Sequence, residues 1–286
     1  MKVNKINIKG IVSESFLSPL LHIAKPPENL YIKGTLPDKK MPVVAIVGTR
    51  RPSAYGREVT QMIASDLARN GVIVVSGLAA GIDTIAHTAT LEAGGTTIAV
   101  LAQGLHEIYP ATNKALSERI TKQGALISEY EIGEPAMKHH FLARNRIVSG
   151  LADAIVVTEA ADKSGTFSTV AHALEQNKEV FAVPGPINSL LSVGPNRLLQ
   201  QGARVVLSAQ DILDVIAPQL VAQQQRLVFG DTPLESLIID LIKSGIRSGD
   251  ELLEKSEATT AEFSTALTML ELHGTIKSLG GNMWSV

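Results

Sequence analysis

Two arginines interrupt an otherwise apolar stretch of the chain, FLARNRIVSG at residues 141–150. Arg144 and Arg146 flank Asn145 there. Arginine is rarely buried without a partner, so the triplet must face an opposite charge, a ligand or water. A planar guanidinium with its fork of N–H donors matches the oxygens of a phosphate. The triplet therefore indicates an anion-binding surface or a paired charge, and other segments have to decide between them.

Further cations lie in glycine-rich turns that follow apolar runs. GTRRPSAYG at 48–56 carries Arg50 and Arg51, and EAADKSGT at 159–166 carries Lys163. Both turns lead into helical stretches, whose N-terminal N–H groups and dipole favour an anion. The first turn fits neither GxGxxG nor GxxxxGK[ST], so a dinucleotide site is poorly supported and an ATP-binding P-loop is absent. Tight turns with solvated arginines are the alternative, and only the turns taken together favour anion binding.

Two other polar patterns have structural explanations as well as functional ones. Ser164 or Thr166 is able to cap the helix that KSGT opens, while Lys163 faces an anion. Asp83 and His87 are four residues apart in a helical stretch, which fits a catalytic pair but more often reflects a contact that orients a loop. The neighbouring pair at 139–140, two histidines, lacks metal-ligand spacing. We therefore expect neither a metal site nor catalytic residues.

The composition limits the class of protein. The chain has 286 residues and no cysteine, which excludes disulfides, thiolate metal sites and a cysteine nucleophile. No apolar run approaches the roughly 18 residues that span a bilayer, so a soluble cytoplasmic protein is expected. Residues 231–286 carry nine acidic and four basic residues, which leaves 22 basic and 19 acidic residues in 1–230. A phosphate-binding surface would therefore belong to the first part of the chain.

Apolar runs alternate with amphipathic stretches from Val43 onward. The runs occupy 43–48, 72–77, 96–104, 125–130, 152–160, 179–185 and 203–209. Helical stretches follow at 54–71, 81–95, 113–124, 165–177, 194–202 and 211–217, and five of them end on the C′ residues Gly71, Gly95, Gly124, Asn177 and Gly202. This order predicts an α/β fold, a doubly wound and mainly parallel sheet of six or seven strands covered on both faces.

The remaining segments frame this domain. Residues 1–40 are expected to be an irregular lead-in, 41–220 the Rossmann-like domain, and 221–231 a polar linker. Residues 232–286 predict three short helices and two strands, a small winged-helix domain. Its presumed recognition helix carries Glu262 and Glu271 but neither Lys nor Arg. A major-groove reader needs basic and amide side chains, so this helix favours a protein contact over DNA.

Ligands of open α/β sheets bind beyond the carboxyl ends of the strands, so the turns at those ends belong together. Their motifs occur in order as GTRxPSxYG, SGLAxGIDxxAH, YPxxNxxL, RNRIVSGLADAIVV, KSGT and EVFAVPG. Together, from about Pro27 to Asp211, they resemble the DNA-processing protein A family, also called DprA or Smf. Many ordered motifs make this resemblance specific.

The resemblance implies an extended Rossmann-like domain that binds single-stranded DNA without sequence preference. It also implies protection of incoming strands in natural transformation, loading of the RecA recombinase, a homodimer, no cofactor and no catalysis. Arg144 and Arg146 would lie over backbone phosphates with Arg50 and Lys163. Phe167 would stack on a base, with a core position as the alternative. The nucleic-acid-binding residues implied in this way are Arg50, Arg51, Ser76, Gly77, Arg144, Asn145, Arg146, Lys163, Ser164, Gly165 and Phe167.

Departures from the family pattern leave other functions open. Ala80 stands where members often carry a cation, and about 26 residues stand where many have a helical N-terminal domain. One alternative is a Rossmann-type nucleotide-binding enzyme resembling the phosphoribohydrolases with PGGxGTxxE, although SGTFSTVAH lacks the second glycine and the glutamate of that motif. Another is a nucleotide-sensing or interaction protein in phage defence or mobile elements, against which the retained RNR and KSG residues argue.

Overall fold

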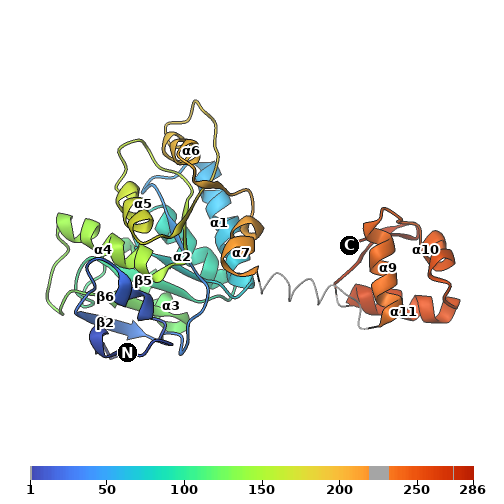
Figure 1. The fold of residues 1–286 in the computed structure, drawn as a ribbon, viewed down its shortest axis with the longest axis horizontal. Coiled ribbons are helices and arrows are strands. Elements are labelled where there is room, and N and C mark those ends of the chain that lie inside the picture. The colour runs from blue at the N-terminus through green and yellow to red at the C-terminus, as the bar shows by residue number, and fades with distance from the viewer. Residues whose placement is uncertain (1, 219–231, 273) are drawn as a thin grey trace. The chain divides into compact units, whose positions relative to one another are not determined.

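The computed structural model describes residues 2–218, 232–272 and 274–286. The chain divides into two compact units, Met1–Ala217 and Pro218–Val286 (Figure 1). The whole of the predicted linker at 221–231, with the preceding residues 219–220, lies outside the described residues. Within the described residues no helix has the length and apolar character needed to span a membrane.

The first unit is built on one nine-stranded sheet with the order β1-β2-β6-β5-β4-β3-β7-β8-β9. Its seven parallel strands are β3 (Val43–Val47), β4 (Ile73–Ser76), β5 (Thr97–Leu101), β6 (Ala125–Ser128), β7 (Ala154–Val157), β8 (Glu179–Ala182) and β9 (Arg204–Val205). They match the seven apolar runs of the sequence. The predicted doubly wound, mainly parallel α/β fold is confirmed.

Two further strands come from the segment that was expected to be irregular, so that expectation is wrong. β1 (Asn4–Asn7) pairs with β2 (Asn29–Gly34), and β2 pairs antiparallel with β6, with Tyr31 opposite Ser128. Leu17 and Leu20 between these strands are fully buried in the main core. Their apolar side chains are scattered among prolines and polar residues, so they show no period in the sequence.

Six α-helices, α1 to α6, connect the seven parallel strands, and α7 follows the last of them; the ribbon in Figure 1 shows these helices around the sheet. They are α1 (Ala54–Arg69), α2 (Ile82–Glu92), α3 (Lys114–Gln123), α4 (Lys138–Leu151), α5 (Thr166–Glu175), α6 (Val193–Gln200) and α7 (Ala209–Ile216). α4 contains the RNR triplet and had not been assigned from the sequence. Gly71, Asn177 and Gly202 have the positive φ expected after a helix, but Gly94 takes this role after α2 in place of Gly95, and Gly124 is extended.

The order of the strands fixes where a ligand would bind. From β3 the chain builds outward through β4, β5 and β6, and α4 then carries it back to β7 on the other side of β3. Val43, Ala45 and Val47 of β3 face the same core cluster as Ile147 and Val148 of α4. The carboxyl ends of β3, β4 and β7 therefore surround the switch point of the sheet, where open α/β folds bind ligands.

The second unit has the predicted winged-helix elements. They are α9 (Pro233–Lys243), α10 (Gly249–Ser256), α11 (Thr260–Leu272), β10 (Lys277–Gly280) and β11 (Met283–Ser285). Ile238, Leu252, Phe263 and Leu270 form a separate apolar core among the three helices. The unit therefore has its own source of stability.

Candidate functional site

A cavity of about 630 Å³ lies at the switch point of the sheet. Its walls come from the β3–α1 turn, the β4–α2 turn, the first three turns of α4 and the N-terminus of α5. The structure thus brings together the turns after β3, β4 and β7, which the sequence grouped with other strand-end turns, but not the turn after β8. Of the residues predicted to bind nucleic acid, it places Arg50, Gly77, Arg144, Asn145, Ser164 and Gly165 in the cavity wall.

Arg144 lies in the wall with only 5% of its surface exposed. Its Nη1 donates to the carbonyl of Gly77 at 2.6 Å and also to the carbonyl of Val100, and its Nε donates to Asn145 Oδ1 at 3.2 Å. Burial lowers the pKa of Arg144 to about 10, with nearby Asp83 opposing that shift. The guanidinium thus remains charged at neutral pH and braces two strand ends from inside the molecule.

Arg146 points to a different partner. Its guanidinium donates two hydrogen bonds to the carboxylate of Glu129, at 2.7 and 2.8 Å. Residues two apart on a helix do not share a face, which separates Arg146 from Arg144. Arg144 therefore donates mainly to backbone carbonyls, and Arg146 donates mainly to a carboxylate. A phosphate contact of Arg146 stays a prediction.

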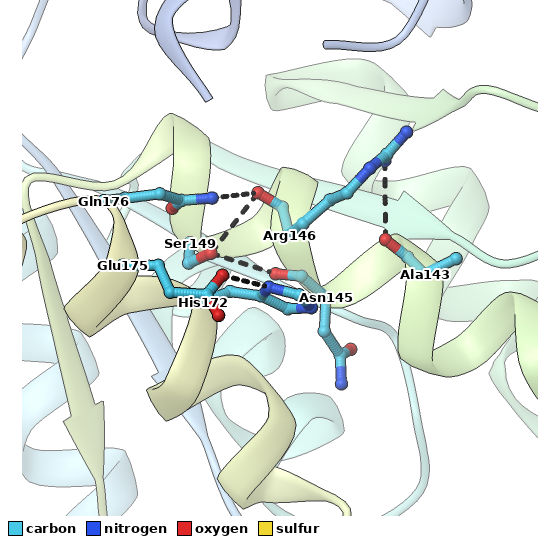
Figure 2. A network of polar contacts seen from close by, with 7 residues as sticks. All are labelled: Ala143, Asn145, Arg146, Ser149, His172, Glu175 and Gln176. Atoms are coloured by element: carbon cyan, nitrogen blue, oxygen red, sulfur yellow. Dashed lines mark hydrogen bonds and ion pairs between the residues drawn. The ribbon is translucent and has the colours of Figure 1, made fainter. Parts of the chain in front are cut away.

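The backbone carbonyls of the triplet accept hydrogen bonds from α4 itself and from the residue that follows α5 (Figure 2). The carbonyl of Arg146 accepts from Gln176 Nε2 at 3.1 Å, and Ser149 Oγ lies 3.2 Å from the carbonyl of Asn145. In Figure 2 the side chains of Asn145 and Arg146 leave α4 in different directions. This network holds α4 against α5, so the Asn145 side chain reaches the cavity from a rigid element.

An exposed cation and two aromatic rings meet at the mouth of the cavity. The Arg50 guanidinium lies 5.5 Å from the centre of the Phe141 ring, and Tyr109 packs edge-on against Phe141 with centroids 5.8 Å apart. Lys138 also lines the cavity and is exposed. Tyr109, Lys138 and Phe141 were not among the site residues predicted from the sequence. The signal was the spacing of 138, 141 and 145 on one helix face, which becomes visible once α4 is assigned.

The β4–α2 turn is held by buried groups. The Asp83 carboxylate accepts the N–H groups of Gly77 at 3.1 Å and Ala79 at 3.2 Å, and burial raises its pKa while Arg144 opposes the shift. Ser76 is fully buried and donates to the carbonyl of Ile46 at 2.7 Å. Asp83 therefore orients the turn, as the structural interpretation of the Asp83 and His87 pattern expected.

His87 does not complete a catalytic pair. Its Nδ1 lies 2.7 Å from the hydroxyl of Thr97, and the ring is fully buried. Burial lowers the pKa of His87 to about 3, so the ring is neutral. In α4, His140 stacks on Tyr130 with centroids 3.9 Å apart. Within the described residues no group of His, Asp and Glu side chains is placed to hold a metal ion.

The KSGT segment leads into α5 as expected, and its residues take different positions in the structure. Ser164 Oγ accepts the N–H of Thr166 at 3.2 Å, and Gly165 borders open space. Lys163 and Arg51 are exposed at the surface of their turns. Phe167 packs against the main core, which is the alternative that the sequence had left open.

The N-terminus of α1 already holds an anion. The carboxylate of Glu159, 2% exposed, accepts the N–H of Ser53 at 2.9 Å and the hydroxyl of Ser53 at 2.5 Å. The sequence predicted that this helix start favours an anion. In the structure the Glu159 carboxylate occupies this anion-binding position at the N-terminus of α1. An external phosphate would therefore have to bind elsewhere in the cavity.

Comparisons with known proteins identify relatives over almost the whole chain. Residues 7–217 match the model of the family DNA recombination-mediator protein A, and residues 218–282 match the DprA winged helix domain. The DNA processing protein DprA of Bacillus subtilis is 42% identical over 211 residues, which are 73% of this chain and 71% of the relative.

Two solved structures share the fold. The structure of DNA processing protein A from Streptococcus pneumoniae has a TM-score of 0.69 at 39% identity, covering 76% of this chain and 75% of that one. The structure of DNA processing protein A from Helicobacter pylori, described for its single-stranded DNA binding mode, has a TM-score of 0.66 at 32% identity. It covers 77% of this chain and 97% of that one.

Proposed function

Since the chain belongs to the DNA recombination-mediator protein A family, we propose that it binds single-stranded DNA without sequence preference. In this proposal the protein acts in the cytoplasm, protects incoming strands and loads a RecA-type recombinase during natural transformation and recombination. The observation that carries the DNA-binding part is the cavity mouth, where Arg50 and Lys138 lie beside the ring pair of Tyr109 and Phe141.

These side chains supply both interactions that a single strand needs. Cations neutralise backbone phosphates, and each aromatic ring offers a face to an unstacked base. A duplex keeps its bases stacked inside, so its base faces cannot reach Phe141 or Tyr109. The N-terminus of α5, with Ser164 and Gly165 in the wall and exposed Lys163 beside them, offers the positive end of the helix dipole and a cation for a second phosphate.

A nucleotide-binding enzyme is the competing function. Dinucleotide-binding folds place a phosphate at the helix that follows the first strand of the sheet. In this chain the corresponding position at α1 holds the Glu159 carboxylate, which would repel a phosphate. This arrangement favours a non-enzymatic strand binder. Release of free base from a nucleoside monophosphate by the purified protein would contradict it.

The proposed homodimer has a suitable surface at the β9 edge. Ile187 and Leu190 follow β8 and are 95% and 80% exposed, and Leu207 follows β9 and is 68% exposed. Since β8 and β9 are parallel neighbours, these side chains leave the same end of the sheet. A second copy would cover this apolar surface. Light scattering of Leu190→Lys together with Leu207→Lys should give a monomer where the natural chain gives a dimer.

The winged-helix unit is proposed to contact protein and not the single strand. The exposed face of α11 includes Glu262 and Glu271, and carboxylates repel phosphates. Deletion of residues 231–286 should leave single-strand affinity nearly unchanged, as measured by fluorescence anisotropy with circular dichroism to check the remaining fold. A large loss of affinity from a folded truncated chain would assign DNA binding to this unit.

The central experiment is a titration of fluorescent oligo-dT with the full chain, followed by competition with unlabelled single strands and duplex of equal length. The single strand should compete far more strongly. Equal competition by the duplex would contradict binding in the cavity. A recombinase-filament assay on strands coated with a single-strand-binding protein tests loading separately, since strand binding alone does not require it.

A further inference from the structure

Glu159 completes the cap of α1 from a distant part of the chain. In an ordinary capping box, the N-cap side chain bonds the N–H of N3, and an acidic residue at N3 bonds back to the N-cap N–H. Ser53 performs the first part, because its Oγ accepts the N–H of Gly56 at 3.1 Å. The second part comes from Glu159 Oε2, which accepts the Ser53 N–H at 2.9 Å across 106 residues.

The glycine at N3 fits this arrangement. A Cβ atom at Gly56 would overlap the carboxylate of Glu159, so residue 56 has no room for a side chain while Glu159 is in place. Elsewhere in the chain, α9 uses the ordinary solution, with Thr232 at the N-cap and Glu235 at N3. α1 thus replaces a local acidic residue by one that reaches it from the end of β7.

The long-range cap joins two turns that face the cavity. Besides the side-chain contacts, the carbonyl of Glu159 accepts the N–H of Thr49 at 2.7 Å. The β3–α1 turn is therefore held at Thr49 and at Ser53, on both sides of Arg50 and Arg51. Beyond β7, Glu159 is followed four residues later by Lys163, so one buried residue lies between the exposed pair Arg50 and Arg51 and the exposed Lys163.

We propose that Glu159 is a positioning residue, which fixes the β3–α1 turn and the β7–α5 turn in the one arrangement that a bound strand requires. Glu159 itself is only 2% exposed, so the proposal assigns it no contact with DNA. The proposal rests on the proposed function for its effect on DNA, but the coupling between the two turns is a property of the protein alone.

The test compares the natural chain with Glu159→Ala and with Glu159→Ala combined with Gly56→Glu. Glu159→Ala removes the cap and the side-chain link to Ser53 but keeps the main-chain bond to Thr49, so the Tm should fall by roughly 5 °C and single-strand affinity by about tenfold. Gly56→Glu in the same background provides a local capping box, Ser53 with an acidic residue at N3. The Tm should then recover most of its loss, while the affinity for oligo-dT should stay low because Ser53 is no longer tied to the β7–α5 turn.

Amide hydrogen exchange gives a readout that needs no DNA. Glu159→Ala should speed exchange in both 48–56 and 159–166, and the double variant should restore protection at the start of α1 only. Glu159→Gln keeps the side-chain volume and controls for a cavity; it should also speed exchange in both segments, and it serves as the test variant if Glu159→Ala does not fold.

Three results would overturn the proposal. Affinity that returns together with the Tm in the double variant would make Glu159 a helix cap and nothing more. A double variant as unstable as Glu159→Ala would show that the carboxylate does not act as the cap. Unchanged exchange in 159–166 would show that the turns are not coupled. Failure of the natural chain to bind oligo-dT would instead contradict the proposed function, and the exchange data would still decide the coupling.

Discussion

The guanidinium of Arg144 occupies the space in which residue 77 would carry a side chain. A Cβ atom at Gly77 would overlap all three terminal atoms of that guanidinium, and the Gly77 carbonyl accepts a hydrogen bond from it at 2.6 Å. Glycine at 77 and arginine at 144 therefore depend on each other, and together they shape the wall of the cavity.

Removing either partner should destabilise the protein. Arg144→Ala leaves the buried carbonyls of Gly77 and Val100 without this donor, which should lower the free energy of unfolding by about 3 kcal/mol. Gly77→Ala should have a similar effect, because the new methyl group displaces the guanidinium. Urea unfolding of both single variants and the double variant measures this, and the double variant should lose clearly less than the sum. Additive losses would show that the two positions are independent.

The salt dependence of single-strand binding should separate the cations. Arg50→Ala and Lys163→Ala each remove an exposed charge and should lower the slope of log K against log salt by roughly one unit. Arg146→Ala is the matched control, because its guanidinium is already paired with Glu129. Anisotropy titrations at several salt concentrations give the slopes. A flatter slope for Arg146→Ala would move that residue into the phosphate-binding group.

Phe141 and Phe167 should respond differently to substitution. Phe141→Ala removes a ring at the cavity mouth, and the loss of stacking should weaken oligo-dT binding by about 1–3 kcal/mol with a small effect on the Tm. Phe167→Leu, in the core, should lower the Tm but keep the affinity of the folded protein. The same titration and a thermal melt measure both. The opposite pattern would restore Phe167 as the stacking residue.

A cation at residue 80 should strengthen binding. Ala80 is exposed and lies next to Ala79, which lines the cavity. Ala80→Arg should add one phosphate contact and tighten binding by roughly several-fold to tenfold at low salt, with a smaller gain as salt rises. Ala80→Gln controls for side-chain size without charge. If neither variant changes affinity or salt slope and both melt like the natural chain, the turn points away from the strand.

The buried His87 should make the protein less stable in mild acid. Its pKa is about 3 in the fold and about 6.5 when unfolded, so the unfolded chain binds the extra proton between these values. The contribution of the neutral His87 to the free energy of unfolding is complete above pH 6.5. It is lost as the pH falls, by about 2 kcal/mol at pH 5. His87→Asn keeps a hydrogen-bond donor for Thr97 but does not titrate. It should therefore reduce the difference between the urea midpoints measured at pH 7 and at pH 5. An unchanged difference would assign the acid sensitivity to other groups.

The sequence by itself determined the alternation of apolar runs and helices. The period of side chains and the glycine-rich turns are local properties, so they predicted six or seven parallel strands, of which the structure has seven, and the winged-helix elements. The same turns located the site, because carboxyl ends of parallel strands share one edge. Ordered motifs such as GTRRPSAYG and KSGT predicted the family, which the comparisons confirm.

Only the tertiary structure decided which partner each polar group meets. Arg144 and Arg146 look equivalent in the sequence, but a helix turns by about 100° per residue, so one meets carbonyls and the other Glu129. Glu159 reaches Ser53 across 106 residues, and β2 pairs with a strand nearly a hundred residues further on. Such contacts follow from the packing of distant elements, and no local pattern of side chains encodes them.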